Sequence, residues 1–280
     1  MTEGSYGAVL VRFSDLWKHL SDAGDEIGWH PHFWRLAKDG STWFHEVDDE
    51  DFQTRMLEES FAAFEADLGF APTSVRMGWD YHNNRSMQTL ARLGVHIDLS
   101  ALPFQSFAGS YNDRGASFAG CFDWSTSGSL PYRPSRLDYR IPAVSDEISI
   151  MELPQNLLQS SFSAFLSEAR GAVRDRSPRR LIRALGPNRI VASTTVKACS
   201  PPFLFRSMVR DVLRREEDWI ATYFHPDELL ARKGSLINDL IHRLSYFSTN
   251  VRSVVRIAER HGRPVEFVTA TEAADLLAHE

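Results

Sequence analysis

The sequence predicts an α/β fold, and three observations support that class. Short apolar runs rich in β-branched residues alternate with stretches of helical periodicity, as in chains where helices connect strands. Glycine follows several of the helical stretches, at the place where a helix commonly ends. Histidine or arginine follows three of the predicted strands, and barrel-type α/β folds build their sites at the carboxyl ends of strands.

Composition excludes several classes of protein. The 280 residues include 31 Lys and Arg against 37 Asp and Glu, with 43% apolar and 24% charged residues. These are globular values, not those of a disordered chain, a collagen or a coiled coil. The net charge of −6 argues against a nucleic-acid partner. Two cysteines, Cys121 and Cys199, are too few for a disulfide framework, so we expect buried thiols.

No part of the sequence predicts a membrane segment. There is no apolar run of about 18 residues, so we expect no membrane span. The chain begins without a basic segment followed by a long apolar stretch, so a secretory signal is not expected. A cytoplasmic location follows as an expectation.

The first hundred residues contain the clearest elements. Residues 51–68 carry apolar side chains at three-, four- and seven-residue spacings before Gly69, which predicts a helix. Similar patterns predict helices from Ser14 to Gly24 and over 84–93. Predicted strands lie at 8–13, 26–29, 73–77 and 95–99.

The rest of the chain begins with an irregular excursion over 100–150, rich in Ser, Gly, Pro and Tyr, which is typical of a functional loop or lid. Further helices are predicted at 157–172, 203–214, 250–261 and 271–278, and strands at 219–224 and 265–268. An Arg-rich insertion at 170–190 is either a solvated face or a site for an anionic partner. We expect a single domain over 1–280.

The strongest local signal is His30-Pro31-His32. Side chains alternate along a strand, so a His-x-His at a strand end directs two imidazoles to the same side. Neutral imidazole is a common ligand for zinc and similar cations. Trp29 and Trp34 flank the pair with flat faces that could stack on sugar rings. Two ordinary histidines in a polar turn are the alternative.

Two further segments carry candidate residues. Arg76 follows a predicted strand, and its planar fork suits an oxyanion or carboxylate; a structural salt bridge is the alternative. Trp79, Asp80 and His82 come directly after it. His225 follows the late strand and could act as a general acid or base, or be a surface histidine before a helix.

In this order, the motifs resemble those of the polysaccharide deacetylases, the NodB-homology carbohydrate esterases, in a divergent branch. The segment 23–30 (AGDEIGWH) is similar to the family's Gly-His-Glu-Ile-Gly-x-His, and 75–79 (VRMGW) to its Arg-x-Pro/Ala-x-Gly. Further similar segments are 89–100 (TLARLGVHIDLS), 130–135 (LPYRPS), 151–154 (MELP) and 223–226 (YFHP). The resemblance covers roughly residues 7–278, so nearly the whole chain.

The resemblance implies a distorted (β/α) barrel and a bacterial enzyme of carbohydrate metabolism. It implies a metal-dependent hydrolase of N- or O-acyl groups on a carbohydrate or N-acyl small molecule. A divalent ion, with zinc expected, would be held by His30 and His32, although the family places its second histidine where Trp34 stands. Arg76 would orient an acidic group, and His225 would be the general acid. The substrate-binding candidates are Trp29, Trp34, Trp79, Asp80 and His82.

The front of the chain departs from the family pattern. Family members begin with a strand that ends in two aspartates, the base and a metal ligand, and no such strand precedes residue 8. We therefore expect a barrel incomplete at the N-terminus, with a gap beside the strand at 8–13 and lower stability. Two alternatives stay open: a non-catalytic relative that binds sugar or a partner, and an amidohydrolase- or PHP-type metallohydrolase.

Overall fold

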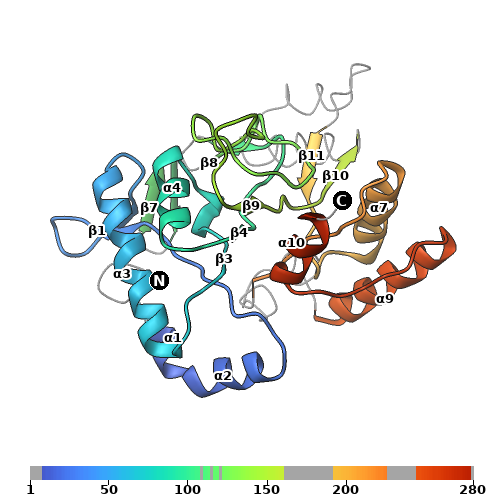
Figure 1. The fold of residues 1–280 in the computed structure, drawn as a ribbon, viewed down its shortest axis with the longest axis horizontal. Helices are drawn as coiled ribbons and strands as arrows, with labels where there is room; N and C mark the ends of the chain where they lie inside the picture. The colour runs from blue at the N-terminus through green and yellow to red at the C-terminus, as the bar shows by residue number, and fades with distance from the viewer. Residues whose placement is uncertain are drawn as a thin grey trace. The chain divides into compact units, whose positions relative to one another are not determined.

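The computed structural model of the chain describes residues 8–107, 110–113, 116–119, 122–160, 192–225 and 244–278. These residues form two compact units (Figure 1). Unit 1 contains residues 1–154 and 267–280, and unit 2 contains residues 155–266. The Arg-rich stretch at 170–190 and Cys121 lie outside the described residues. The expectation of a single domain stays a prediction.

The chain begins with two helices, α1 (Ala8–Arg12) and α2 (Ser14–Asp22). The predicted strand at 8–13 is therefore wrong, and so is the gap expected beside it. A short, mostly apolar run fits a strand and a helix equally well by periodicity. Packing decides here, because Leu10 and Trp17 lie against the main hydrophobic core of unit 1.

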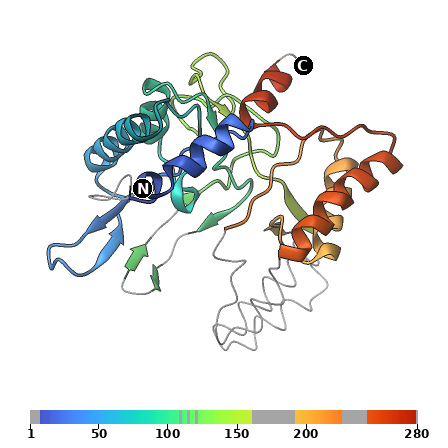
Figure 2. The ribbon, with the colours of Figure 1, turned by 90° about the horizontal axis from the view of Figure 1, so that it is seen from below.

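Two short strands form an antiparallel hairpin, β1 (Trp34–Leu36) and β2 (Trp43–His45), drawn in blue in Figure 2. Asp39 stabilises its turn by accepting hydrogen bonds from the backbone amides of Ser41 and Thr42. The hairpin belongs to a four-stranded sheet of order β1-β2-β7-β6, completed by β6 (Ser110–Asp113) and β7 (Ala116–Ala119).

The helices α3 (Glu50–Leu68) and α4 (Asn84–Arg92) confirm the two strongest helix predictions. Asp49 caps α3 by accepting a hydrogen bond from the amide of Phe52, and Gly69 ends it in the left-handed conformation. Asn83 and Ser86 form a reciprocal cap at the start of α4. The two helices pack against each other in unit 1.

A small parallel sheet lies in the middle of unit 1 (Figure 1). It contains β3 (Ser74–Val75), β4 (Ile97–Asp98) and β9 (Met151–Glu152), in that order. Trp29 extends it through a parallel bridge to Val75. The segments predicted as strands at 26–29, 73–77 and 95–99 thus do meet in one sheet, although their regular parts are shorter.

The excursion over 100–150 is largely irregular, as expected. Besides β6 and β7 it contains two strands of two residues each, β5 (Ser106–Phe107) and β8 (Phe122–Asp123), which pair antiparallel. Trp124 follows them and is fully buried in the core of unit 1. The excursion therefore contributes to the core.

Unit 2 contains a two-stranded antiparallel sheet of β10 (Leu157–Ser160) and β11 (Ala192–Thr195), with helices α7 (Pro202–Arg214) and α9 (Leu244–Arg260). Its core joins side chains of β10, α7 and α9. The predicted helix at 157–172 is wrong at its start, where β10 lies, and its remainder at 161–172 lies outside the described residues. Residues 219–224 and 265–268, predicted as strands, have no regular structure.

The last helix, α10 (Ala270–Ala278), returns to unit 1 and confirms the final helix prediction. The amide of Thr271 donates to Glu26 at 2.8 Å, which ties this helix to the segment before Trp29. The described residues form a mixed α/β structure without a closed sheet, so a barrel is not confirmed. No helix among them is long and apolar enough to span a bilayer.

Candidate functional site

The candidate site lies where the strands of the parallel sheet end. His30 follows the bridge at Trp29, and Arg76 follows β3, so both leave the same edge of the sheet. The two segments are joined by hydrogen bonds, since the amide of Trp29 donates to Ser74 and that of Arg76 to Trp29. Parallel pairing thus brings together two of the three segments singled out in the sequence.

The imidazole rings of His30 and His32 lie next to each other, edge to face. Their ring centroids are 4.8 Å apart, with the planes nearly perpendicular at 88°. The Nδ1 atom of the exposed His30 lies 2.6 Å from the carbonyl oxygen of Arg76. A carbonyl can only accept, so Nδ1 carries the proton and Nε2 the lone pair. This backbone contact fixes the tautomer and the orientation of the ring.

A glycine lies directly against His32. A Cβ atom added at Gly78 would stand 2.1 Å from Nδ1 of His32 and 2.3 Å from its Cγ. The amide of Gly78 also donates to the carbonyl of Pro31 at 2.7 Å. Only a residue without a side chain allows this approach, so Gly78 determines where the second imidazole lies.

Tryptophans border the histidine pair. The ring of Trp34 stacks on His32 with centroids 6.4 Å apart and an interplanar angle of 22°. Trp79 lies at 6.4 Å from Trp34, edge to face, and is 38% exposed. Flat apolar faces beside polar donors suit the ring of a sugar, which has an apolar face and a hydroxyl rim.

Arg76 is held beside this aromatic surface. Its Nη2 donates to Oδ1 of Asp80 at 2.9 Å, and both side chains are less than one-fifth exposed. The backbone carbonyl of Asp80 also accepts a hydrogen bond from Trp124 Nε1 at 2.7 Å. The guanidinium therefore has a set orientation, and its charge is permanent.

Two expected substrate-binding residues lie in the core instead. Trp29 is 1% exposed and packs edge-on against Phe61. The side chain of His82 is fully buried, and its Nε2 lies 2.9 Å from Oδ2 of Asp98. In this conformation neither side chain is open to solvent, so neither can stack on a ligand.

His225 belongs to unit 2 and is described there by itself. It is exposed and lies in an irregular segment, not at a strand end. Its ring stands perpendicular to that of Tyr223 at 5.6 Å. The general-acid role of His225 stays a prediction.

The donor set for the implied divalent metal is incomplete among the described residues. His30 and His32 offer two imidazoles, with the first oriented as a metal ligand would be. The described part of the chain contains no group of three His, Cys, Asp or Glu arranged to hold an ion. These residues do not by themselves fit a metal centre, and we assign no chemical step to a metal ion.

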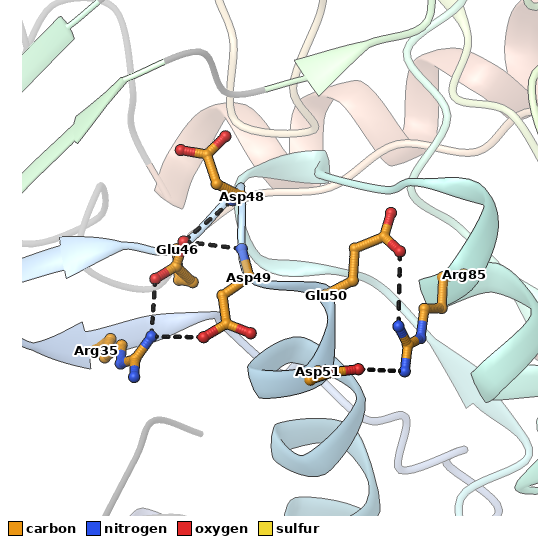
Figure 3. A pocket seen from close by; sticks show the side chains of 7 residues that line it. All are labelled: Arg35, Glu46, Asp48, Asp49, Glu50, Asp51 and Arg85. Carbon is orange, nitrogen blue, oxygen red and sulfur yellow. Dashed lines mark hydrogen bonds and ion pairs between the residues drawn. The ribbon is translucent and has the colours of Figure 1, made fainter.

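A charged pocket of about 610 Å³ opens at the start of α3, and Figure 3 shows the side chains that line it. The lining residues are Arg35, Glu46, Asp48, Asp49, Glu50, Asp51 and Arg85. Arg35 donates to Glu46 at 3.0 Å and to Asp49 at 2.9 Å, which connects the hairpin to the start of the helix. The pocket contains none of the predicted site residues, and its contacts are those of a structural junction.

Beneath the site, three buried polar residues escaped the sequence analysis as functional candidates: Asp98, Ser100 and Glu152. Asp98 and Glu152 are register partners on β4 and β9, so their side chains leave the sheet on the same side. In the sequence, Asp98 and Glu152 are each a single carboxylate within a short apolar segment, and this pattern could have marked them. A buried charge needs partners, and such a residue commonly marks a polar network.

No family model and no curated protein matches the chain. A solved structure from Mycobacterium smegmatis, assigned to the polysaccharide deacetylases, is 19% identical over 98% of this chain and 70% of its own, with a TM-score of 0.48. Another comes from Bordetella bronchiseptica and is assigned to a polysaccharide deacetylase of O-antigen biosynthesis. It is 14% identical over 72% of this chain and 84% of its own, with a TM-score of 0.19. Both are distant likenesses.

Proposed function

We propose that the chain binds an acylated carbohydrate at the surface formed by His30, His32, Trp34, Trp79 and Arg76, and hydrolyses an N- or O-acyl group of it. The observation that carries this proposal is the convergence, at one edge of the sheet, of two imidazoles in contact, two tryptophan rings beside them and a guanidinium held by Asp80. Sugar-ring stacking and acyl-group chemistry need these two kinds of side chain next to each other.

Each side chain has a defined task in this proposal. Trp79 and Trp34 stack on the sugar and hold its acyl group over the histidine pair. Arg76 donates to the carbonyl oxygen as negative charge develops on it during attack by water, since its charge is permanent. His30, with its proton on Nδ1, presents Nε2 to take the proton of the attacking water. The C–N or C–O bond of the acyl group then breaks, acetate is released, and a proton passes to the departing amine or hydroxyl group.

The test is acetate release from an N-acetylglucosamine oligomer and from an O-acetylated xylo-oligosaccharide. We expect His30→Ala and Arg76→Ala each to lower kcat/KM by at least ~10²-fold, the usual range for a lost acid–base or oxyanion contact. His19→Ala, which removes an exposed histidine of α2, is the matched control and should retain full activity. Acetate release that is equal in all four proteins would overturn the proposal. His225→Ala tests the predicted general acid in the same assay.

The zinc prediction has its own measurement. If His30 and His32 contribute to a metal centre together with other ligands, elemental analysis of the purified protein before and after EDTA will show a divalent ion that is lost when both residues are changed to Ala. Equal metal content in the wild type and the double variant would rule out the pair as ligands.

A second candidate is a non-catalytic sugar-binding protein. The incomplete donor set of the described residues favours it. It predicts that the oligosaccharides bind without acetate release and that Trp79→Ala abolishes binding, as measured by isothermal titration calorimetry. EDTA-sensitive acetate release by the wild type would exclude it.

A further inference from the structure

The turn that presents Trp79 has an unfavourable backbone conformation. Trp79 and Asp80 both have positive φ angles, 60° and 53°, at consecutive positions. Residues other than glycine rarely adopt this backbone conformation, and such strain persists only where the surroundings hold it in place. The segment from Met77 to His82 must therefore be fixed by contacts at its ends.

One carboxylate connects both ends of this turn. Oδ1 of Asp98 accepts a hydrogen bond from Ser100 Oγ at 2.5 Å, and Ser100 Oγ accepts one from the amide of Met77 at 2.8 Å. Oδ2 of the same Asp98 lies 2.9 Å from Nε2 of His82. Asp98, Ser100 and the side chain of His82 are fully buried, so water does not compete for these contacts.

The neighbouring strand carries a second buried carboxyl group beside Asp98. Glu152 lies beside Asp98 on β9, is fully buried, and accepts a hydrogen bond from the amide of Ala101 at 3.0 Å. Burial raises the pKa of Glu152 well above its usual range, and Asp98 raises it further. Burial alone would raise the pKa of Asp98, but the nearby His82, the neighbouring Glu152 and the hydrogen bond from Ser100 lower it. Asp98 is thus ionised beside a protonated Glu152.

We propose that Asp98 is a positioning residue for the carbohydrate site: through Ser100 and His82 it holds the strained turn Met77–His82 in the conformation that presents Trp79 and orients Asp80 toward Arg76. The ligand rests on the proposed function, whereas the holding of the turn is measurable without any ligand.

Ser100→Ala removes the link between Asp98 and Met77 without a buried charge change. We expect the amide hydrogen of Met77 to exchange at least ~10-fold faster, measured by NMR, because its acceptor is lost. Exchange of the Leu90 amide in α4 should stay unchanged, as a measure of global stability. Ser100→Thr keeps the hydroxyl group and should restore slow exchange.

The chain offers a matched control. Ser125 donates to Asp123 two residues before it at 2.6 Å, the same arrangement as Ser100 and Asp98, but at an exposed position. Ser125→Ala should leave the exchange of Met77 unchanged. Unchanged Met77 exchange in Ser100→Ala would overturn the holding of the turn, whatever the activity of the protein.

The effect on the site is read from ligand binding. In Ser100→Ala and Asp98→Asn, KM for the N-acetylglucosamine oligomer should rise at least ~10-fold because Trp79 is displaced, and kcat should fall as well because Asp80 no longer orients Arg76. Faster Met77 exchange with unchanged KM would overturn the positioning role. A wild type that neither binds nor hydrolyses either oligosaccharide would refute the proposed function, and the exchange measurement would still decide the role of Asp98 in the turn.

Discussion

Gly78 shows how one missing side chain can shape a site. The imidazole of His32 occupies the space that a Cβ would fill, at 2.1 Å from the atom it would meet. Because a Cβ and the imidazole cannot share that space, an alanine here must displace His32 from its position.

We therefore expect Gly78→Ala to lower the free energy of unfolding by about 1–3 kcal/mol, the usual cost of overpacking, and to weaken oligosaccharide binding. Urea denaturation and calorimetric titration measure the two effects. Gly128→Ala is the control, since a Cβ at Gly128 meets no atom within 4 Å, and its stability should change by less than about 0.5 kcal/mol. A stable Gly78→Ala variant with full affinity would contradict the packing argument.

The carboxyl pair predicts a pH dependence of stability. Burial raises the pKa of Glu152 well above the ordinary 4.5, so the folded protein keeps a proton that the unfolded chain releases. The folded state then binds more protons, and this group makes stability fall as pH rises above 4.5, by about 1.4 kcal/mol per pH unit, until the folded-state pKa is reached.

Glu152→Gln removes this titration and keeps a donor for Asp98. We expect its free energy of unfolding, relative to wild type, to rise with pH above the ordinary pKa of 4.5 until the folded-state pKa of Glu152 is reached, as measured by urea denaturation at several pH values. Glu147→Gln, which removes an exposed carboxyl group, should follow the wild type. Parallel curves for wild type and Glu152→Gln would show that Glu152 does not hold a proton in the folded state.

At the scale of residues, alternation along a strand was sufficient to predict that His30 and His32 face the same side. It could not reveal that Trp29 is buried or that Gly78 supports His32, because both depend on contacts between segments far apart in the sequence. The contact of His82 with Asp98 could not be predicted either, because Asp98 lies in a separate segment, on β4.

Among the helices and strands, the cap of α3 offers a direct test. The side chain of Asp49 accepts a hydrogen bond from the amide of Phe52 at 2.9 Å, satisfying a donor that the helix leaves unpaired. Asp49→Ala should cost about 1 kcal/mol of stability in urea denaturation, and Asp49→Asn, which retains an acceptor, much less. An equal loss in both variants would point to the partly exposed ion pair with Arg35 instead of the cap.

Helices were predicted well where a long periodic pattern coincided with a terminator. The pattern before Gly69 and the one before Gly94 each end where expected. Short apolar runs were less informative: residues 8–12 form a helix, and 219–224 form neither helix nor strand. In such segments the number of residues is too small for periodicity to distinguish the two, and burial against neighbours decides.

At the scale of the whole molecule, each unit has a hydrophobic core of its own. Met208 of α7 is fully buried in the core of unit 2, whereas Phe203 of the same helix is 60% exposed. Met208→Ala should therefore cost about 2–5 kcal/mol, and Phe203→Ala less than about 0.5 kcal/mol. Thermal and urea denaturation would measure this difference, and equal losses would contradict the described packing of α7.

The sequence by itself determined the α/β class, the principal helices and the convergence of His30 and Arg76 at one edge of a sheet. These depend on periodicity, on helix-ending glycines and on the shared direction of parallel strands, all of which are local or follow from general rules. Only the tertiary structure decided that residues 8–12 are helical, that His82 is buried, and that Asp98 lies against His82 and Ser100. Those outcomes depend on which side chains exclude water from one another, and no single segment contains that information.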